Sequence, residues 1–229
     1  MSAARKRSRR STPPTAAESR PTYIAVDGPI GVGKTTLVQR LAEQFGAKVL
    51  IEIVEENPFL SEFYREPDKF AFQTQLFFLL SRYRQQQDLW QPDLFHPYLF
   101  SDYIFAKDRL FASLTLTENE MLLYDQVFQI LDTRVLKPDL VVYLQARQEV
   151  LLERIKRRGR PFEKNFDADY LKQLCDAYSD YFFHYADTPL LVVDTSDIDV
   201  VSSHEDFLDL SRSILKHRGG VQFYKPLGR

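Results

Sequence analysis

Short apolar runs alternate with longer amphipathic segments along most of this chain. Five runs are rich in aliphatic and aromatic residues without an internal breaker, and each predicts a buried strand: residues 22–26, 47–51, 97–102, 138–144 and 189–194. Apolar residues at helical spacing predict helices after the first strand and at 68–87, 118–133, around 150–155, 167–185 and 202–215. This alternation predicts an α/β fold in which helices flank a five-stranded parallel sheet.

A glycine-rich sequence lies between the first strand and its helix. Residues 28–35 match the phosphate-loop pattern G-x-x-x-x-G-K-[ST] at every fixed position. Backbone N–H groups and the helix N-terminus favour an anion there, Lys34 would reach the β- and γ-phosphates, and the Thr35 hydroxyl would bind Mg²⁺. A glycine turn without a ligand is the structural alternative, but the complete spacing favours a nucleoside triphosphate. The expected nucleotide contacts are Gly28, Pro29, Ile30, Gly31, Val32, Gly33, Lys34, Thr35 and Thr36.

Acidic residues follow the second predicted strand. Glu52, Glu55 and Glu56 lie at or just beyond its carboxyl end, which is where open parallel sheets bind ligands. A carboxylate next to the phosphate loop is well placed for chemistry, but acids at a helix start also stabilise the helix N-terminus. Spacing alone leaves both interpretations open.

Polar residues interrupt the apolar face of the predicted helix 68–87. Gln73 and Gln75 stand among phenylalanines, and burying a glutamine without partners is costly. Each therefore points to solvent or contacts a ligand.

A basic cluster ends the helix that follows the fourth strand. Arg154, Arg157, Arg158 and Arg160 lie around Gly159. Solvated helix ends can carry such a cluster, but arginines on a mobile segment are also what phosphoryl transfer needs to neutralise charge on the moving group. We favour the second interpretation and predict an arginine-rich lid.

Composition narrows the class of protein. The 229 residues carry a formal net charge of −2, which implies no overall attraction to nucleic acid. No apolar run approaches the roughly 18 residues of a membrane-spanning helix, and the single cysteine, Cys175, suits a reducing cytoplasm. Residues 1–20 are basic and predict a disordered leader. The histidines have no zinc-ligand spacing, and no G-x-S-x-G motif indicates Ser-His-Asp chemistry.

Several motifs together resemble the deoxynucleoside kinases, particularly the bacterial deoxyadenosine and deoxyguanosine kinases. The likeness spans roughly residues 22 to 200. It is carried by the phosphate loop with Asp27 and Thr36, then by the segments 52–60, 63–64, 72–75, 81–84, 101–103, 108–109 and 158–161, all in the family's order. The resemblance implies a phosphate-loop kinase fold with a lid at residues 154–163.

The resemblance also implies roles for individual residues. By position, Glu52 matches the general base that accepts the proton of the substrate 5′-hydroxyl, with Glu55 as the fallback. Tyr64 and Glu163 match residues that hold the 3′-hydroxyl. The remaining matches are Gln75 for pairing with the base edge, Arg82 and Asp108 for tuning base choice, Arg154, Arg158 and Arg160 for the phosphates, and 194–199 for covering the donor adenine.

One departure from the family pattern leaves a role open. Many members have an acid, an arginine and a serine after the third strand, where the acid helps to hold Mg²⁺ and the arginine steadies the phosphates. Here Asp102 precedes Tyr103, so the metal role carries over and the arginine role does not. Arg109 or a lid arginine is the expected substitute.

The resulting expectation is a cytoplasmic, ATP- and Mg²⁺-dependent kinase of purine deoxynucleosides. Its kinase domain would span residues 21–215 and be followed by a loosely attached tail at 216–229. We expect a homodimer, because the apolar stripes of 70–83 and 122–131 exceed what one sheet face needs, and we expect neither nucleic-acid nor membrane partners. A nucleoside monophosphate kinase of the thymidylate type and a non-catalytic nucleotide-binding subunit are the alternatives.

Overall fold

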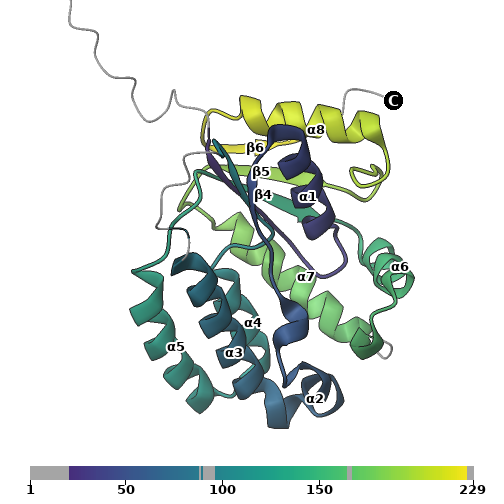
Figure 1. Cartoon of the computed structure of the whole chain (residues 1–229). Coiled ribbons are helices and arrows are strands. Elements are labelled where there is room, and N and C mark those ends of the chain that lie inside the picture. The colour runs from purple at the N-terminus through teal and green to yellow at the C-terminus, as the bar shows by residue number, and fades with distance from the viewer. Residues whose placement is uncertain (1–20, 88, 90–95, 164–166, 226–229) are drawn as a thin grey trace, which may run out of the picture.

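A parallel six-stranded sheet organises the protein in the computed structural model, which describes residues 21–87, 89, 96–163 and 167–225 (Figure 1). The strands are β1 (Tyr23–Asp27), β2 (Lys48–Leu50), β3 (Leu99–Ser101), β4 (Leu140–Gln145), β5 (Leu190–Asp194) and β6 (Val221–Phe223), in the spatial order β2-β3-β1-β4-β5-β6. All five residues of β1 are buried, as expected of a central strand covered on both faces. The predicted α/β class with a parallel sheet is confirmed. The predicted leader at 1–20 lies outside the described residues.

The sheet has one strand more than predicted. Val221–Phe223 lies within the segment expected to be a loosely attached tail, yet it pairs in parallel with β5. All three residues are exposed, and the alternation of Val221, Gln222 and Phe223 is too short to predict a strand. Backbone hydrogen bonds to the open edge of β5 fix this strand, and the Tyr224 hydroxyl, which donates to Asp209 of α8 at 2.7 Å, ties down its end.

Helices cover both faces of the sheet. They are α1 (Lys34–Phe45), α2 (Leu60–Arg65), α3 (Pro67–Gln87), α4 (Lys107–Thr115), α5 (Glu118–Asp132), α6 (Gln148–Arg158), α7 (Ala168–Phe183) and α8 (His204–Lys216), with short 3-10 turns at η1 (Val54–Glu56) and η3 (Pro161–Glu163). Side chains alternate along β1, so that Ile24 and Val26 pack with α1 and α8, whereas Tyr23 and Ala25 pack with α4 and α7. Helices α3 and α5 pack on α4 around a separate apolar cluster.

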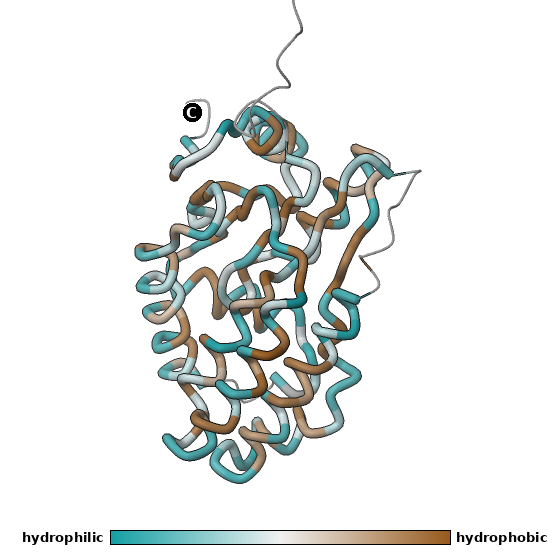
Figure 2. Tube along the Cα trace, turned by 90° about the vertical axis from the view of Figure 1, so that its left-hand side faces the viewer, coloured by the Kyte–Doolittle hydropathy of each residue, from teal (hydrophilic) through white to brown (hydrophobic). Residues whose placement is uncertain are grey.

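Figure 2 shows hydrophobic colour concentrated along the inner strands and inner helix faces, with hydrophilic colour on the outer turns. Among the described residues, no helix combines the length and the apolar character needed to cross a membrane.

The sheet brings three chain segments to one edge. Strands β2, β3 and β1 are neighbours and run in parallel, so the residues after their carboxyl ends meet. Gly28 follows β1, Glu52 lies two residues after β2, and Asp102 directly follows β3. Open parallel sheets bind ligands at this edge.

Candidate active site

The phosphate loop (residues 28–35) connects β1 to α1 by a path that only glycine can follow at two positions. Gly28 and Gly31 have φ angles of 147° and 86°. A Cβ atom on Gly28 would lie 2.1 Å from the carbonyl oxygen of Leu144, and one on Gly31 would lie 3.0 Å from that of Leu151. The loop therefore curls tightly against β4 and α6, with the N-terminus of α1 directed toward the curl.

Lys34 is the loop's cation. Its ammonium donates hydrogen bonds to the carbonyl oxygens of Gly28 at 2.7 Å and Pro29 at 3.1 Å. Burial, and after it the positive charge of Lys107, lowers the pKa of Lys34 to about 8. Phosphate oxygens can replace these neutral carbonyl partners with a stronger, charged acceptor.

Thr35 and Asp102 place two oxygen atoms together beside Lys34. The Thr35 hydroxyl donates to Oδ2 of Asp102 at 2.5 Å, and Oδ1 of Asp102 accepts the backbone N–H of Glu52 at 2.7 Å. Burial and the nearby Glu52 charge raise the pKa of Asp102. A divalent cation would relieve this concentration of negative charge, and a hydroxyl and a carboxylate are the hard oxygen ligands that Mg²⁺ prefers.

Glu52 is held between two buried cations. Its Oε1 accepts from the guanidinium of Arg82, and its Oε2 accepts from Nζ of Lys107 at 2.7 Å. Arg82 also donates to Asp108, which is almost fully buried behind it. Burial acts to raise the pKa of Glu52, but the charges of Arg82 and Lys107 outweigh it, so this pKa lies well below its ordinary value. Glu52 is consequently an ionised acceptor throughout the physiological pH range.

A cavity of about 210 Å³ opens beside Glu52, and we call it the acceptor cavity. Its walls come from the phosphate loop, η1, α2, α3, α4 and the segment after α6. They include Glu52, Tyr64, Gln75, Arg82, Asp102 and Glu163, which were predicted from the resemblance, together with Phe78, Lys107, Phe111 and Tyr170. Two phenylalanine rings and a buried amide match what a flat heterocycle with a polar edge requires.

The lid closes one end of the acceptor cavity. Arg158 pairs with Glu163 through two nitrogens, with Nε 3.2 Å from Oε2, and Arg160 pairs with Glu55 at 3.0 Å. Burial raises the pKa of Tyr64, and the neighbouring Tyr170 and Glu163 act in the same direction. Tyr64 and Glu163 both line this cavity.

A second cavity, of about 410 Å³, lies on the other side of the phosphate loop, and we call it the donor cavity. It is lined by residues 31–36, Arg154, Arg157, Arg158, Arg160 and 199–201. Arg154 donates to the hydroxyl and the carbonyl oxygen of Thr195 at 3.0 and 2.9 Å, which ties α6 to the loop after β5. Both cavities share Gly31, Lys34 and Thr35, as well as two lid arginines. The phosphate loop therefore lines both cavities, so that a group bound in one cavity would lie close to a group bound in the other.

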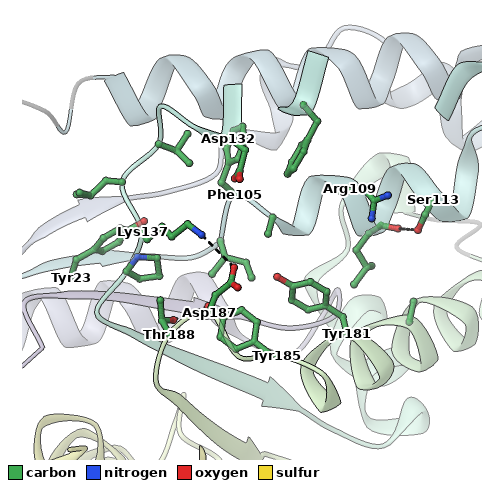
Figure 3. Close-up of a pocket in the computed structure, with 18 of the residues that line it drawn as sticks. Tyr23, Phe105, Arg109, Ser113, Asp132, Lys137, Tyr181, Tyr185, Asp187 and Thr188 are labelled. Atoms are coloured by element: carbon green, nitrogen blue, oxygen red, sulfur yellow. Dashed lines mark hydrogen bonds and ion pairs between the residues drawn. The ribbon is translucent and has the colours of Figure 1, made fainter. Parts of the chain in front are cut away.

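Two expected positions differ from the prediction. Arg109, proposed as a substitute for the arginine that does not follow Asp102, lies at neither cavity and pairs with Asp125 of α5 at 2.8 Å. Its side chain borders a separate, larger cavity of about 440 Å³ between α4, α5 and α7, together with the Lys137–Asp187 ion pair (Figure 3). Asp108 does not line the acceptor cavity either and contacts it only through Arg82.

The structure also adds cavity residues to which the sequence analysis gave no individual role. Lys107 lies at the start of α4 and meets a glutamate 55 positions earlier, a pairing without a local signal. Tyr170 of α7 reaches the acceptor cavity, and Arg157 reaches the donor cavity. Arg157 could have been selected, because it belongs to the basic cluster at the lid.

Comparison with known proteins agrees with this geometry. The profile of a family described as deoxynucleoside kinase matches residues 24–217. Deoxyguanosine kinase of Bacillus subtilis (strain 168) is 38% identical over 190 residues, which cover 81% of this chain and 92% of that protein. Deoxyadenosine kinase of Dictyostelium discoideum is 37% identical over 166 residues, covering 70% and 66%. Among solved structures, deoxyadenosine kinase from M. mycoides with bound dCTP superposes with a TM-score of 0.71 at 25% identity, covering 84% of this chain and all of that one.

Proposed function

The chain belongs to the deoxynucleoside kinase family, and we propose that it transfers the γ-phosphate of ATP to the 5′-hydroxyl of deoxyguanosine or deoxyadenosine. One observation carries the proposal for the site. The donor and acceptor cavities meet at Gly31, Lys34 and Thr35, with Glu52 on the acceptor side of that junction. A triphosphate in one cavity and a hydroxyl in the other would be in line across the phosphate loop, and alignment is the main contribution a protein makes to phosphoryl transfer.

In this mechanism Glu52 orients the 5′-hydroxyl as an ionised hydrogen-bond acceptor. Its lowered pKa makes it a weak base, so it takes up the hydroxyl proton late, when the new phosphorus–oxygen bond has largely formed. Lys34 binds the β- and γ-phosphates, and Arg158 and Arg160 neutralise the transferred group as the lid closes.

Thr35 and Asp102 are the proposed Mg²⁺ ligands, because their oxygens lie 2.5 Å apart next to Lys34. The ion, when bound, neutralises charge on the donor phosphates. The protein's own contribution is to hold Asp102 in place through the backbone N–H of Glu52.

The acceptor cavity supports a neutral acceptor over a nucleoside monophosphate. Of its cations, Arg82, Lys107, Arg158 and Arg160 each pair with a carboxylate within the described part of the chain. A monophosphate would have to displace one of these carboxylates, whereas a sugar hydroxyl only has to hydrogen-bond to them. This favours a nucleoside kinase over the thymidylate-kinase alternative.

We also propose a cytoplasmic homodimer. Helix α5 exposes Leu122, Leu123 and Ile130 by 51–66%, and α7 exposes Phe183 by 85%, so large apolar side chains on two helices are open to a second copy of the chain. The free Cys175 suits the reducing cytoplasm, where ATP is available. A monomer mass in light scattering would contradict the proposed homodimer. Recovery of the native protein in a membrane or secreted fraction would contradict the proposed cytoplasmic location.

Phosphate transfer from [γ-³²P]ATP tests the function directly. We expect label in the 5′-monophosphate of deoxyguanosine or deoxyadenosine, in the presence of Mg²⁺. Turnover only with deoxycytidine or thymidine would contradict the purine assignment. Transfer only to dAMP or dTMP would identify a monophosphate kinase, and no transfer to any acceptor would return the chain to a nucleotide-binding subunit.

A further inference from the structure

Lys107 is a buried cation at the acceptor cavity that has no role in the mechanism proposed above. It is the first residue of α4, its side chain is 4% exposed, and its Nζ lies 2.7 Å from Oε2 of Glu52. Its ammonium also lies 5.8 Å from the ring centre of Tyr103 and 5.9 Å from that of Phe111. Burying an ammonium costs free energy unless an anion compensates it, and an apolar residue would fill the same space without that cost.

The surroundings of Lys107 suggest what its charge is for. Glu52 already has a cationic partner in Arg82, which is fixed from behind by Asp108. Lys107 instead lines the acceptor cavity together with Lys34. Two ammonium groups that line the same cavity repel each other. An anion bound between them would be attracted to both and would offset this repulsion.

The expected sources of positive charge at this position are otherwise engaged. Tyr103, not a cation, follows Asp102, and Arg109 is directed to Asp125. The lid arginines Arg158 and Arg160 line both cavities, and each pairs with a glutamate other than Glu52. Among the described residues that line the acceptor cavity, Lys107 is the cation nearest to Glu52 that is not itself fixed by a second carboxylate.

We propose that Lys107 is the acceptor-side cation of the reaction, whose ammonium binds an oxygen of the migrating γ-phosphoryl group while Lys34 and the lid arginines bind it from the donor side. The inference rests on the proposed kinase function. The 5′-oxygen forms a bond to phosphorus, the bond from phosphorus to the β–γ bridging oxygen breaks, ADP leaves, and the hydroxyl proton passes to Glu52. Lys107 keeps its protons throughout.

Variants at Lys107 test the proposal. We expect Lys107→Met to lower kcat by about 10²–10³-fold, the usual effect of removing one group that stabilises transition-state charge, with KM for ATP changed only a few-fold. Lys107→Arg should recover part of this loss. The exposed Lys137, paired with Asp187, provides the matched control, and Lys137→Met should leave both kcat and KM for ATP unchanged.

Four outcomes would decide the matter. Wild-type kcat in Lys107→Met would overturn the proposal, as would a loss of kcat that tracks thermal unfolding and is not partly recovered in Lys107→Arg. Loss of kcat in Arg109→Met instead would return the role to Arg109. Lys107→Gln, which still donates a hydrogen bond to Glu52, replaces the methionine variant if that variant does not fold. If the wild type phosphorylates no deoxynucleoside at all, the kinase function itself fails and the role of Lys107 with it.

Discussion

Nε2 of Gln75 donates a hydrogen bond to the Thr115 hydroxyl at 3.1 Å, and that hydroxyl donates onward to the carbonyl oxygen of Phe111 at 2.9 Å. The hydroxyl has one proton, which Phe111 takes, so its oxygen can serve Gln75 only as an acceptor. If the Gln75 amide were flipped, its carbonyl oxygen would face the Thr115 hydroxyl oxygen, and neither atom would have a proton to donate to the other. Gln75 is buried, and it therefore presents its carbonyl oxygen and one remaining N–H to the acceptor cavity in a fixed order.

The fixed amide predicts that Thr115 contributes to base selection. Adenine and guanine offer donor and acceptor in opposite order at positions 1 and 6, so one amide orientation cannot serve both equally in one position. We expect Thr115→Val to reduce the ratio of kcat/KM between the preferred and the other purine deoxynucleoside by about tenfold, the effect of one hydrogen bond of about 1.4 kcal/mol. Competition between deoxyguanosine and deoxyadenosine measures the ratio.

Thr115→Ser serves as the control, because it keeps the hydroxyl. It should retain the wild-type ratio, and neither variant should alter KM for ATP. An unchanged purine ratio in Thr115→Val would show that some other contact orients Gln75.

Two glycines with left-handed backbone provide a paired test of the phosphate loop. Gly31 has a φ of 86°, and a Cβ there would approach Cγ1 of Ile155 at 2.8 Å. Gly31→Ala must therefore shift the loop, and we expect it to raise Kd for ATP at least about tenfold, with a backbone strain of about 1–3 kcal/mol. Isothermal titration calorimetry measures the affinity.

Gly46, which ends α1 with a φ of 58°, has nothing within 4 Å of such a Cβ. Gly46→Ala should reduce thermal stability by about 1 kcal/mol and leave ATP affinity unchanged. Equal losses of ATP affinity in both variants would mean that the effect on ATP arises from general destabilisation and not from the loop.

The strands that could be predicted are the buried ones, because burial requires apolar residues along the strand. β4 is buried along Leu140–Leu144 and reads as an apolar, β-branched run, whereas β6 has only three residues, which are exposed and held through their backbone, so it is too short to be recognised in the sequence. The phosphate loop was equally readable, because its glycines, lysine and threonine lie at fixed spacing within residues 28–35. Local chemistry is visible in a sequence, and backbone pairing at an edge is not.

The active-site cations illustrate a feature that could not be predicted from the sequence, namely the direction in which a side chain points. Lys107 and Arg109 are two residues apart, so helix geometry directs them about 200° apart around α4. Lys107 reaches Glu52, and Arg109 reaches Asp125 on α5. The sequence shows both charges, but which one faces the site depends on how α4 packs. Gln75 and Arg82 were predicted from the resemblance to the family's motifs, because the spacing of these residues alone does not show which way their side chains point.

The lowered pKa of Lys34 predicts a pH dependence for ATP binding. Its protonated form binds phosphate, and burial together with Lys107 lowers its pKa to about 8 in the free protein. As pH rises through that value the free protein loses the ammonium, so binding must take up a proton and Kd for ATP rises, by up to about tenfold per pH unit. Calorimetry in buffers of different ionisation enthalpy measures both Kd and the proton uptake.

Nucleoside affinity over the same pH range is the internal control, because Lys34 is not expected to bind the base. A flat Kd for ATP from about pH 7 to about pH 10, without proton uptake, would contradict the assignment of this pKa. Lys107→Met should move the rise in Kd to higher pH, since it removes one of the charges that disfavour the ammonium.

Glu52 and Glu55 lie three residues apart, and comparing variants of the two distinguishes a catalytic carboxylate from an exposed one. Glu52 is paired with two buried cations, whereas the Glu55 side chain is 59% exposed and pairs with Arg160. We expect Glu52→Gln to lower kcat at least about a hundredfold, because an amide cannot accept the 5′-hydroxyl proton, and Glu55→Gln to change kcat less than threefold, roughly the effect of losing a surface ion pair. Glu52→Gln also leaves Arg82 and Lys107 without their anion, so thermal unfolding must be measured alongside, and kcat compared well below the melting temperature. Wild-type turnover in Glu52→Gln together with an inactive Glu55→Gln would transfer the base to Glu55, which would then have to leave Arg160 to reach the substrate hydroxyl.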